Sequence, residues 1–380
     1  MKVRARVDFL DIKTGDQRKV DDEFDVDFTR YQELLCNGID VEPIFIEYRG
    51  NKKKHGPKII IYQKLLYCIG GIETWDYNLA KTFEDRDITF VFSSADKIQF
   101  MELSRYANVM MDDDERWYEC DVFINANYDG SDILLNRLKA KKIYQTIHSD
   151  FGALKRINGW SNFDIRIDER TDHIFSASET AQKGLKQAFG YDSTVLPNIL
   201  AKPDYDTQSV NAREGAKPTV FISLTRASEE KGIGRCIEMA RQFKKEGRNF
   251  IWLLCSTLEA GDYDQNKQRI EAIKQSPEFI QVQPQLYSRK LLHFADYLVQ
   301  LSDTEAYCYS VREALQLGVP VICSDIPEFR KIVKPGKNGY ILSLDLHDLD
   351  TDKIFNNIPT DITYEETISP LWEEVLDGKV

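Results

Sequence analysis

The apolar residues of this chain fall into strand-like runs and helical spacings that alternate from about residue 59 onwards. In the first block, runs rich in β-branched and aromatic residues predict strands, at 88–92, 121–125, 142–147, 173–177 and 193–198. Helices are expected over 71–83, where apolar residues recur near helical spacing, and over 179–190, which ends at a glycine. Such alternation predicts a parallel sheet with helices packed on its faces.

The same alternation restarts after a polar stretch, 201–218, that we interpret as an interdomain linker. Strands are expected in this second block, each followed by a helical segment except the last, at 219–223, 250–255, 279–282, 296–301, 320–324 and 339–343. Two such blocks predict an α/β protein with two Rossmann-like domains facing across a cleft, over 59–200 and 217–357. Ligands should bind at the carboxyl ends of the strands.

The two ends of the chain fall outside these blocks. Residues 1–50 combine short strand patterns with one helix and are expected to form a small accessory α+β module, too small for a catalytic pocket of its own. The basic run 51–58 is interpreted as part of a solvated linker, with contact to a polyanion or membrane as the alternative. The tail, 358–380, is expected to form a helix whose Leu371, Trp372 and Val375 pack back on the body.

Composition and charge narrow the classes of function. The chain has 380 residues and a net charge of −12, which disfavours nucleic acid as the main partner because phosphate binding needs basic surface. No apolar run is long enough to span a bilayer, and the first residues lack an apolar signal core. The seven cysteines are scattered and never form a CxxC pair, as expected of reduced thiols. We therefore expect a cytoplasmic protein, with contact at the inner membrane face and homo-oligomers left open.

The stretch 302–318 holds the first candidate chemistry. Ser310 and Glu313 fit a capping box, so Glu313 has a structural explanation. Glu305 has none, and it lies in the loop after a strand, beside the positive end of the next helix. A carboxylate there can accept hydrogen bonds from sugar hydroxyls, and the helix N-terminus can bind a diphosphate.

Cations and glycines follow other strands. Arg226 and Lys231 come after the strand 219–223 and match a diphosphate, although surface charge beside two glutamates would also explain them. Gly70 and Gly71 stand between an apolar run and a helix, where the backbone can approach a phosphate or sugar, or simply make a tight turn. His148 directly follows a strand and would face the cleft, unless it is a structural histidine.

The sequence lacks the motifs of several other kinds of chemistry. No histidines have metal-ligand spacing, so no protein-bound metal is expected. Neither GxGxxG nor GxxxxGK[ST] occurs, which argues against dinucleotide redox chemistry and P-loop hydrolysis.

Taken together, these pieces resemble the retaining GT-B glycosyltransferases of family 4, also called glycosyl transferases group 1. The E-x7-E spacing of Glu305 and Glu313 is followed by a segment similar to the donor-site segment of that family. The segments "GGIETW", "TIHSD", "SASE", "VLPN" and "SLTRASEEKG" precede it in family order. The resemblance covers roughly residues 59–344.

The resemblance implies a function and a role for each site residue. A sugar would move from a nucleoside-diphosphate donor, with UDP favoured, to a glycan, lipid-linked or protein hydroxyl in cell-surface polysaccharide or glycoconjugate synthesis. The implied catalytic residues are Glu305 and His148 at the donor sugar, with Arg226 and Lys231 neutralising the diphosphate. The implied donor-binding groups also include Gly70 and Gly71, the backbone amides of Tyr309, Ser310 and Val311, and Glu313 at the ribose. No metal or other cofactor is implied.

The sequence departs from this family in one loop. The usual Gly-Phe-Gly after the first glutamate is replaced by Ala306, Tyr307 and Cys308. The main alternative function is a glycosyltransferase-like subunit that binds a glycan or a partner enzyme without turnover. Glycogen- or sucrose-type chemistry on the same fold and DNA glucosylation are further alternatives, disfavoured by the short chain and by the net acidity.

Overall fold

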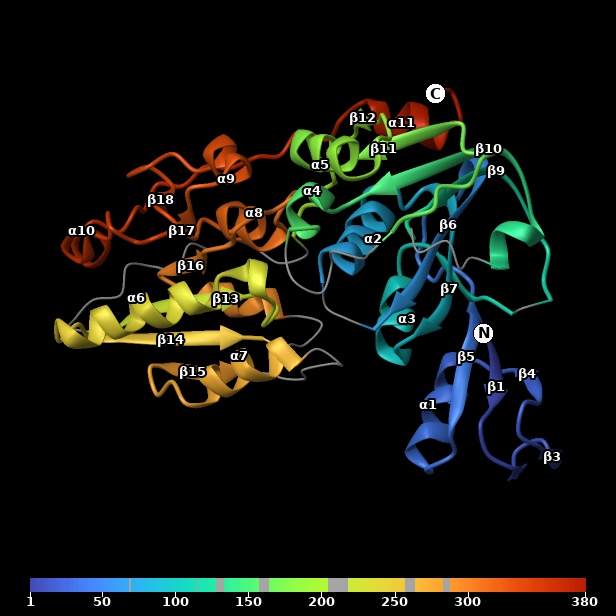
Figure 1. Ribbon diagram of the computed structural model, residues 1–380. Coiled ribbons are helices and arrows are strands. Elements are labelled where there is room, and N and C mark those ends of the chain that lie inside the picture. The colour runs from blue at the N-terminus through green and yellow to red at the C-terminus, as the bar shows by residue number, and fades with distance from the viewer. Residues whose placement is uncertain are drawn as a thin grey trace.

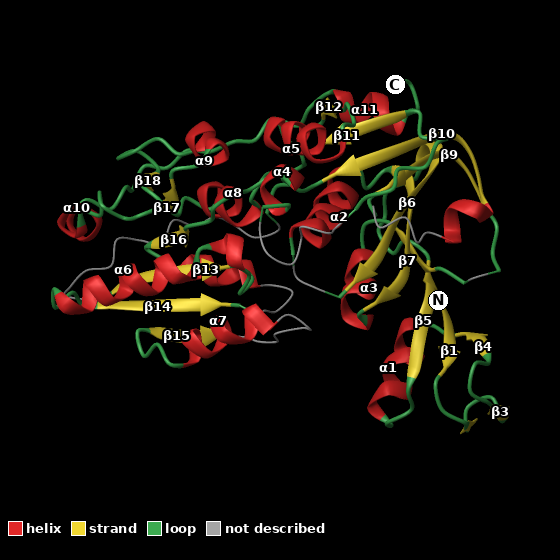
Figure 2. Ribbon diagram, viewed as in Figure 1, coloured by secondary structure: helices red, strands yellow, loops and turns green. Residues whose placement is uncertain are grey.

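Two separate sheets organise the computed structural model, which describes residues 1–67, 70–113, 115–127, 133–156, 164–203, 218–256, 264–282 and 288–380. Figure 2 shows them as two groups of yellow strands, each flanked by red helices. This arrangement confirms the predicted α/β fold with two domains.

The N-terminal sheet has ten strands. Their spatial order is β12 (Thr194–Val195), β11 (His173–Ser176), β10 (Leu138–Ile147), β9 (Tyr118–Asn125), β6 (His55–Leu66), β7 (Arg86–Ala95), β8 (Asn108–Met111), β5 (Val41–Ile46), β1 (Lys2–Ala5) and β4 (Glu23–Asp25). Pairs from β12 to β8 are parallel, and those from β8 to β4 are antiparallel. The helical segments of this part are α2 (Gly71–Thr82), α3 (Lys97–Leu103), η1 (Ile133–Arg137), α4 (Phe151–Leu154) and α5 (Glu179–Phe189).

The C-terminal sheet has six parallel strands in the order β15 (Phe279–Val282), β14 (Phe250–Cys255), β13 (Thr219–Leu224), β16 (Tyr297–Gln300), β17 (Val321–Ser324) and β18 (Gly339–Leu342). The helical segments here are η2 (Glu229–Lys231), α6 (Ile233–Lys245), α7 (Asp264–Lys274), η3 (Ser288–Phe294), α8 (Tyr309–Gln316), α9 (Pro327–Ile332) and α10 (Thr351–Asn356). This strand order is that of the Rossmann fold. Across the described residues, no helix is both long and apolar enough to cross a membrane.

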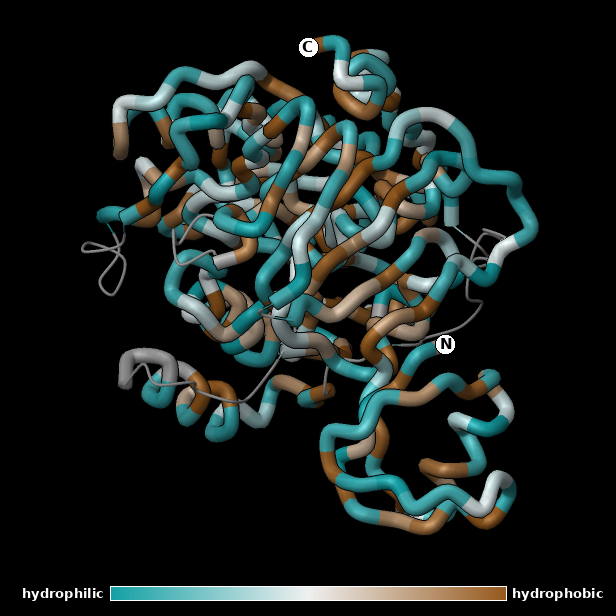
Figure 3. Tube along the Cα trace, turned by 90° about the vertical axis from the view of Figure 1, so that its right-hand side faces the viewer, coloured by the Kyte–Doolittle hydropathy of each residue, from teal (hydrophilic) through white to brown (hydrophobic). Residues whose placement is uncertain are grey.

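The first 50 residues extend the N-terminal sheet. Strands β1, β4 and β5 continue it beyond β8, while β2 (Phe9–Asp11) and β3 (Asp16–Arg18) form a separate hairpin. Helix α1 (Phe28–Cys36) begins at its cap Asp27 and packs Tyr31 and Leu34 into a small local core. Figure 3 shows this α+β lobe projecting from the body.

Several elements lay outside the sequence prediction, among them η1 and α4. Strand β6 begins at His55, inside the run interpreted as a linker, and its 12 residues continue to Leu66. Helix α3 and strand β8 were not expected either. The basic residues at the start of β6 interrupt the apolar alternation, whereas its buried centre, Ile59–Tyr62, lies between β7 and β9.

The tail returns to the N-terminal domain. Its helix α11 (Leu371–Leu376) is shorter than the sequence pattern indicates, but Trp372 and Val375 are buried in the N-terminal core as predicted. The indole N–H of Trp372 donates to the carbonyl of Pro197 at 2.8 Å, and Arg86 forms an ion pair with Asp377 at 2.7 Å. Figure 1 shows α11, in red, beside β11 and β12.

Candidate active site

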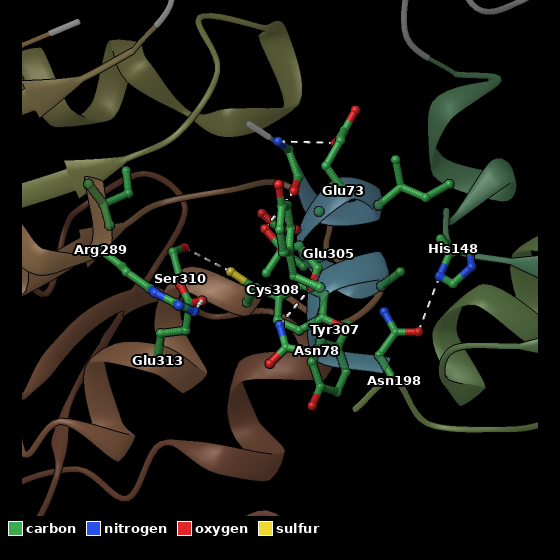
Figure 4. Close-up of a pocket in the computed structure, with 18 of the residues that line it drawn as sticks. Glu73, Asn78, His148, Asn198, Arg289, Glu305, Tyr307, Cys308, Ser310 and Glu313 are labelled. Carbon is green, nitrogen blue, oxygen red and sulfur yellow. Dashed lines mark hydrogen bonds and ion pairs between the residues drawn. The ribbon is translucent and has the colours of Figure 1, made fainter. Parts of the chain in front are cut away.

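A cavity of about 510 Å³ lies between the two domains at the carboxyl ends of their strands. The N-terminal domain contributes the start of α2 and the loop after β10, and the C-terminal domain contributes the loop after β13 and the start of α8. Figure 4 shows side chains from both domains converging on it. Every site residue named from the sequence lines this cavity except Val311, whose side chain packs in the core of the C-terminal domain.

Lys231 and Glu305 form the centre of the C-terminal wall. The Lys231 Nζ lies 2.7 Å from Glu305 Oε1, and both side chains are largely buried. The same carboxylate oxygen accepts a hydrogen bond from the Ser302 hydroxyl at 2.7 Å. Glu305 therefore has a structural partner that the sequence did not indicate, and an anion entering here would compete with it for the lysine.

Gly232 fixes the position of Lys231. Its φ is +66°, and a Cβ atom there would lie 1.9 Å from the carbonyl oxygen of Leu301. Only glycine permits this conformation and this close approach. The Arg235 guanidinium donates to the same carbonyl at 2.6 Å. The loop after β13 is thereby held against the loop after β16.

Arg226 is more exposed than Lys231. Its guanidinium donates to Glu230 Oε1 at 3.2 Å, and 59% of its side chain is accessible. Both interpretations from the sequence thus describe part of the geometry, because Arg226 pairs with a neighbouring glutamate and also lines the cavity. It is free to turn toward a ligand at little cost, since exposed pairs contribute little stability.

The capping box predicted at Ser310 and Glu313 is absent. Helix α8 begins at Tyr309, so Cys308 is its N-cap, and the Cys308 side chain makes no capping hydrogen bond. Ser310 lies two residues beyond this N-cap, inside the helix, and cannot serve as the cap. The first N–H groups of α8 lack a side-chain cap at the edge of the cavity, an arrangement that suits an anion.

Cys308 occupies the place of a family glycine, and its backbone shows why glycine is usual there. Its φ of 60° and ψ of 81° lie in the left-handed region. We expect the free energy of unfolding of Cys308→Gly to exceed that of Cys308→Ala by about 1 kcal/mol, because alanine keeps the strain and glycine relieves it. Chemical denaturation of both variants tests this, and equal stabilities would contradict it.

Glu313 is buried beside Arg289, a residue that the sequence analysis did not select. The Arg289 guanidinium lies 3.6 Å from the Glu313 carboxylate. Burial raises the pKa of Glu313, and the arginine partly opposes this shift. Figure 4 shows Arg289, Ser310 and Glu313 together at one end of the cavity. A cluster of this kind could hold the hydroxyls and phosphate of a nucleotide.

Glu73 on the N-terminal wall was also missed. It is the third residue of α2, 7% exposed, and its Oε2 accepts the Gly70 N–H at 3.1 Å. Burial raises its pKa to about 7. The sequence carried a signal for this residue, since a glutamate three residues after the N-cap, here Gly70, can bond back to the N–H of the cap.

His148 lies at the end of β10 with both ring nitrogens engaged. Nδ1 is 3.1 Å from Asn198 Oδ1, and Nε2 is 3.1 Å from Thr146 Oγ1. Its ring packs against that of Trp75 in a tilted arrangement, with the ring centroids 4.7 Å apart. Burial lowers the pKa of His148 to about 4, so the imidazole is neutral at neutral pH. A sugar could be contacted by one ring nitrogen only if a protein partner released it.

Two tyrosines connect the domains: Tyr307, in the loop that differs from the family pattern, and Tyr309, the first residue of α8. Tyr307 and Tyr309 come from the C-terminal domain but pack in the N-terminal core, and the Tyr309 hydroxyl donates to the Ile199 carbonyl at 3.0 Å. Nearby, the Thr304 hydroxyl donates to Asp150 Oδ2 at 2.7 Å. These contacts hold the loop of Glu305 against the opposite domain.

Metal ligands are not grouped in this site. Among the residues with defined positions, no three histidine, cysteine, aspartate or glutamate side chains lie close enough to hold an ion.

Solved structures that are similar to this chain share its two-domain architecture. HepE of Anabaena in complex with UDP-glucose has 15% identity and a TM-score of 0.58, covering 80% of this chain and 92% of that one. A glycosyltransferase from Rickettsia africae has 12% identity and a TM-score of 0.56, covering 81% and 90%. The fold is therefore GT-B, as predicted.

Part of the chain also matches a known protein family by sequence. Residues 204–348 match the family described as Glycosyl transferases group 1, which confirms the predicted likeness to that group over the C-terminal domain. A UDP-N-acetylglucosamine–peptide N-acetylglucosaminyltransferase GtfA subunit of Streptococcus pneumoniae is 21% identical over 187 residues. The match spans 49% of this chain but only 37% of that relative.

Proposed function

We propose that this chain is a retaining glycosyltransferase of family 4, with a nucleoside-diphosphate sugar as donor. The observation that carries the proposal is the Lys231–Glu305 pair, 2.7 Å apart in an interdomain cavity that also exposes a glycine pair and a helix N-terminus. A UDP-linked sugar is favoured because HepE was solved with UDP-glucose and the streptococcal relative is named for a UDP-sugar. The acceptor would be a glycan, lipid-linked or protein hydroxyl of a cell-surface polymer or glycoconjugate.

In the proposed reaction, the bond between the sugar and the diphosphate breaks while the acceptor oxygen bonds to the same face of the same carbon. The leaving diphosphate takes the acceptor proton. Lys231, Arg226 and the first amides of α8 stabilise the negative charge that develops, so no protein-bound metal is required. Glu305 would accept hydrogen bonds from the donor sugar, and Glu313 from the ribose.

Gly71 supplies a test of donor placement. A Cβ atom at residue 71 would meet no protein atom within 4 Å, although the residue lines the cavity. We expect Gly71→Ala to fold normally and to weaken UDP binding about tenfold or more, because the methyl group occupies space that the donor needs. Calorimetric titration with UDP measures this. Gly234→Ala, another glycine with open space, is the matched control, and equal affinities would contradict the placement.

Donor turnover tests the proposed function itself. The protein is incubated with UDP-, GDP- and ADP-linked sugars, and release of the nucleoside diphosphate is measured with and without simple sugar or polyol-phosphate acceptors. We expect release from at least one UDP-sugar, with the product retaining the anomeric configuration of the donor by NMR. Release from none of the donors, or an inverted product, would overturn the proposal.

A further inference from the structure

At the start of α2, the Glu73 carboxyl lies directly against the backbone of Gly70, the first residue of the glycine pair. A Cβ atom on residue 70 would lie 2.8 Å from Glu73 Oε2, the oxygen that accepts the Gly70 N–H. Both glycines and Glu73 line the cavity, and Figure 4 shows Glu73 among the side chains around it. The backbone at Gly70, which lines the cavity, therefore fixes the position of the Glu73 carboxyl.

Charges around Glu73 come from both domains. Arg226 of the C-terminal domain faces it across the cavity and favours its charged form, whereas burial disfavours that form. On its own helix, Asp76 is fully buried and neither carboxylate oxygen has a hydrogen-bond partner. Burial, together with the nearby Glu73, raises the pKa of Asp76 well above its usual range.

A bound diphosphate would shift the balance between the charged and the neutral form of Glu73. The cavity is lined by as many carboxylates as cations, and Arg226 and Lys231 already pair with Glu230 and Glu305. A donor entering beside Arg226 adds at least two negative charges. Like charges brought close together favour the protonated form of a carboxyl group.

We propose that Glu73 takes up a proton from solvent when the donor binds, and that its neutral carboxyl then donates a hydrogen bond to a phosphate oxygen. The inference rests on the proposed function and deepens its donor site. The proton returns to solvent when the nucleoside diphosphate leaves, so the cycle is balanced. Glu73 is then a binding residue that makes donor affinity depend on pH.

Two other titratable groups that line the cavity also have shifted pKa values. His148 is neutral and stays so, because burial holds its pKa near 4. Glu313 is buried beside Arg289 at the far end of the site, and burial raises its pKa too. Replacing Glu73 therefore distinguishes proton uptake by Glu73 from proton uptake by Glu313.

The experiment is calorimetric titration of the full chain with UDP at pH 7.5, in buffers with different heats of ionisation. We expect uptake of about three quarters of a proton per UDP bound, because Glu73 is about one quarter protonated before binding, and affinity that falls by nearly tenfold per pH unit above pH 7.5. Glu73→Gln keeps an oxygen for the Gly70 N–H. This variant should bind UDP without proton uptake and with affinity that is nearly constant from pH 7 to 8.5.

Glu102→Gln is the matched control. Glu102 lies on the rim of the same cavity and pairs with Arg105 at 3.0 Å, so its variant should retain the proton uptake. UDP binding with no buffer dependence, or uptake that persists in Glu73→Gln, would overturn this inference and leave the proposed function standing. Absence of UDP binding by the wild-type protein would overturn the proposed donor, and this inference with it.

Discussion

Replacing Lys231 by alanine is expected to lower kcat/KM for sugar transfer by 10²–10³-fold. The ammonium group lies inside the cavity, with 17% of the side chain exposed, and it is the group that compensates Glu305. Without it, the Glu305 carboxylate remains in place, held by Ser302 at 2.7 Å, and repels an incoming diphosphate. The loss therefore combines a missing attraction with an added repulsion.

Two comparisons make this prediction specific. Arg226→Ala should cost only about tenfold, because that side chain is 59% exposed and solvent screens its charge. Lys245→Ala removes an exposed lysine at the end of α6 and should leave the rate unchanged. A Lys231→Ala enzyme within threefold of the wild type in steady-state kinetics would show that this lysine does not neutralise the leaving group.

Replacing Tyr309 by alanine is expected to lower the free energy of unfolding by about 3–5 kcal/mol. Tyr309 is 6% exposed, and its ring packs with Tyr307 at 4.8 Å within the N-terminal core. The truncation opens a cavity where the two domains meet. It should also reduce transfer, because Tyr309 is the first residue of α8, whose N-terminus lines the cavity proposed to hold the donor.

Tyr309→Phe is the control for that prediction. It removes only the hydroxyl group that donates to the Ile199 carbonyl, and it should cost about 1 kcal/mol. Denaturant unfolding followed by fluorescence measures both variants. Equal losses for the alanine and phenylalanine variants would contradict a packing role for the ring.

The sequence predicted the fold well because strand–helix alternation is a local signal. It placed both Rossmann-like blocks, and it also indicated that Trp372 and Val375 are buried. It missed β6 because a parallel strand buried at its centre can begin in polar residues, as this one does at His55. No local pattern marks where such a strand starts when its neighbours β7 and β9 supply the pairing.

The candidate site was predictable as a set of residues but not as a set of contacts. Glu305 and Lys231 were each selected from their loops, yet their pairing depends on Gly232 holding two loops together. The capping box at Ser310 failed because Cys308 adopts a left-handed conformation and starts the helix earlier. The packing of Tyr309 against the opposite domain depends on how the domains meet, which no stretch of sequence encodes by itself.

Binding of a nucleotide sugar tests the central claim most directly. Thermal unfolding is followed for the wild-type protein and Lys231→Ala, each with UDP-glucose and UDP-N-acetylglucosamine. The account predicts a higher Tm for the wild type with at least one of them, since ligand at 100 times its Kd adds about 2.7 kcal/mol, and little or no rise for the variant. No stabilisation of the wild type by either sugar, or an equal rise in both proteins, would contradict a donor site at Lys231 and Glu305.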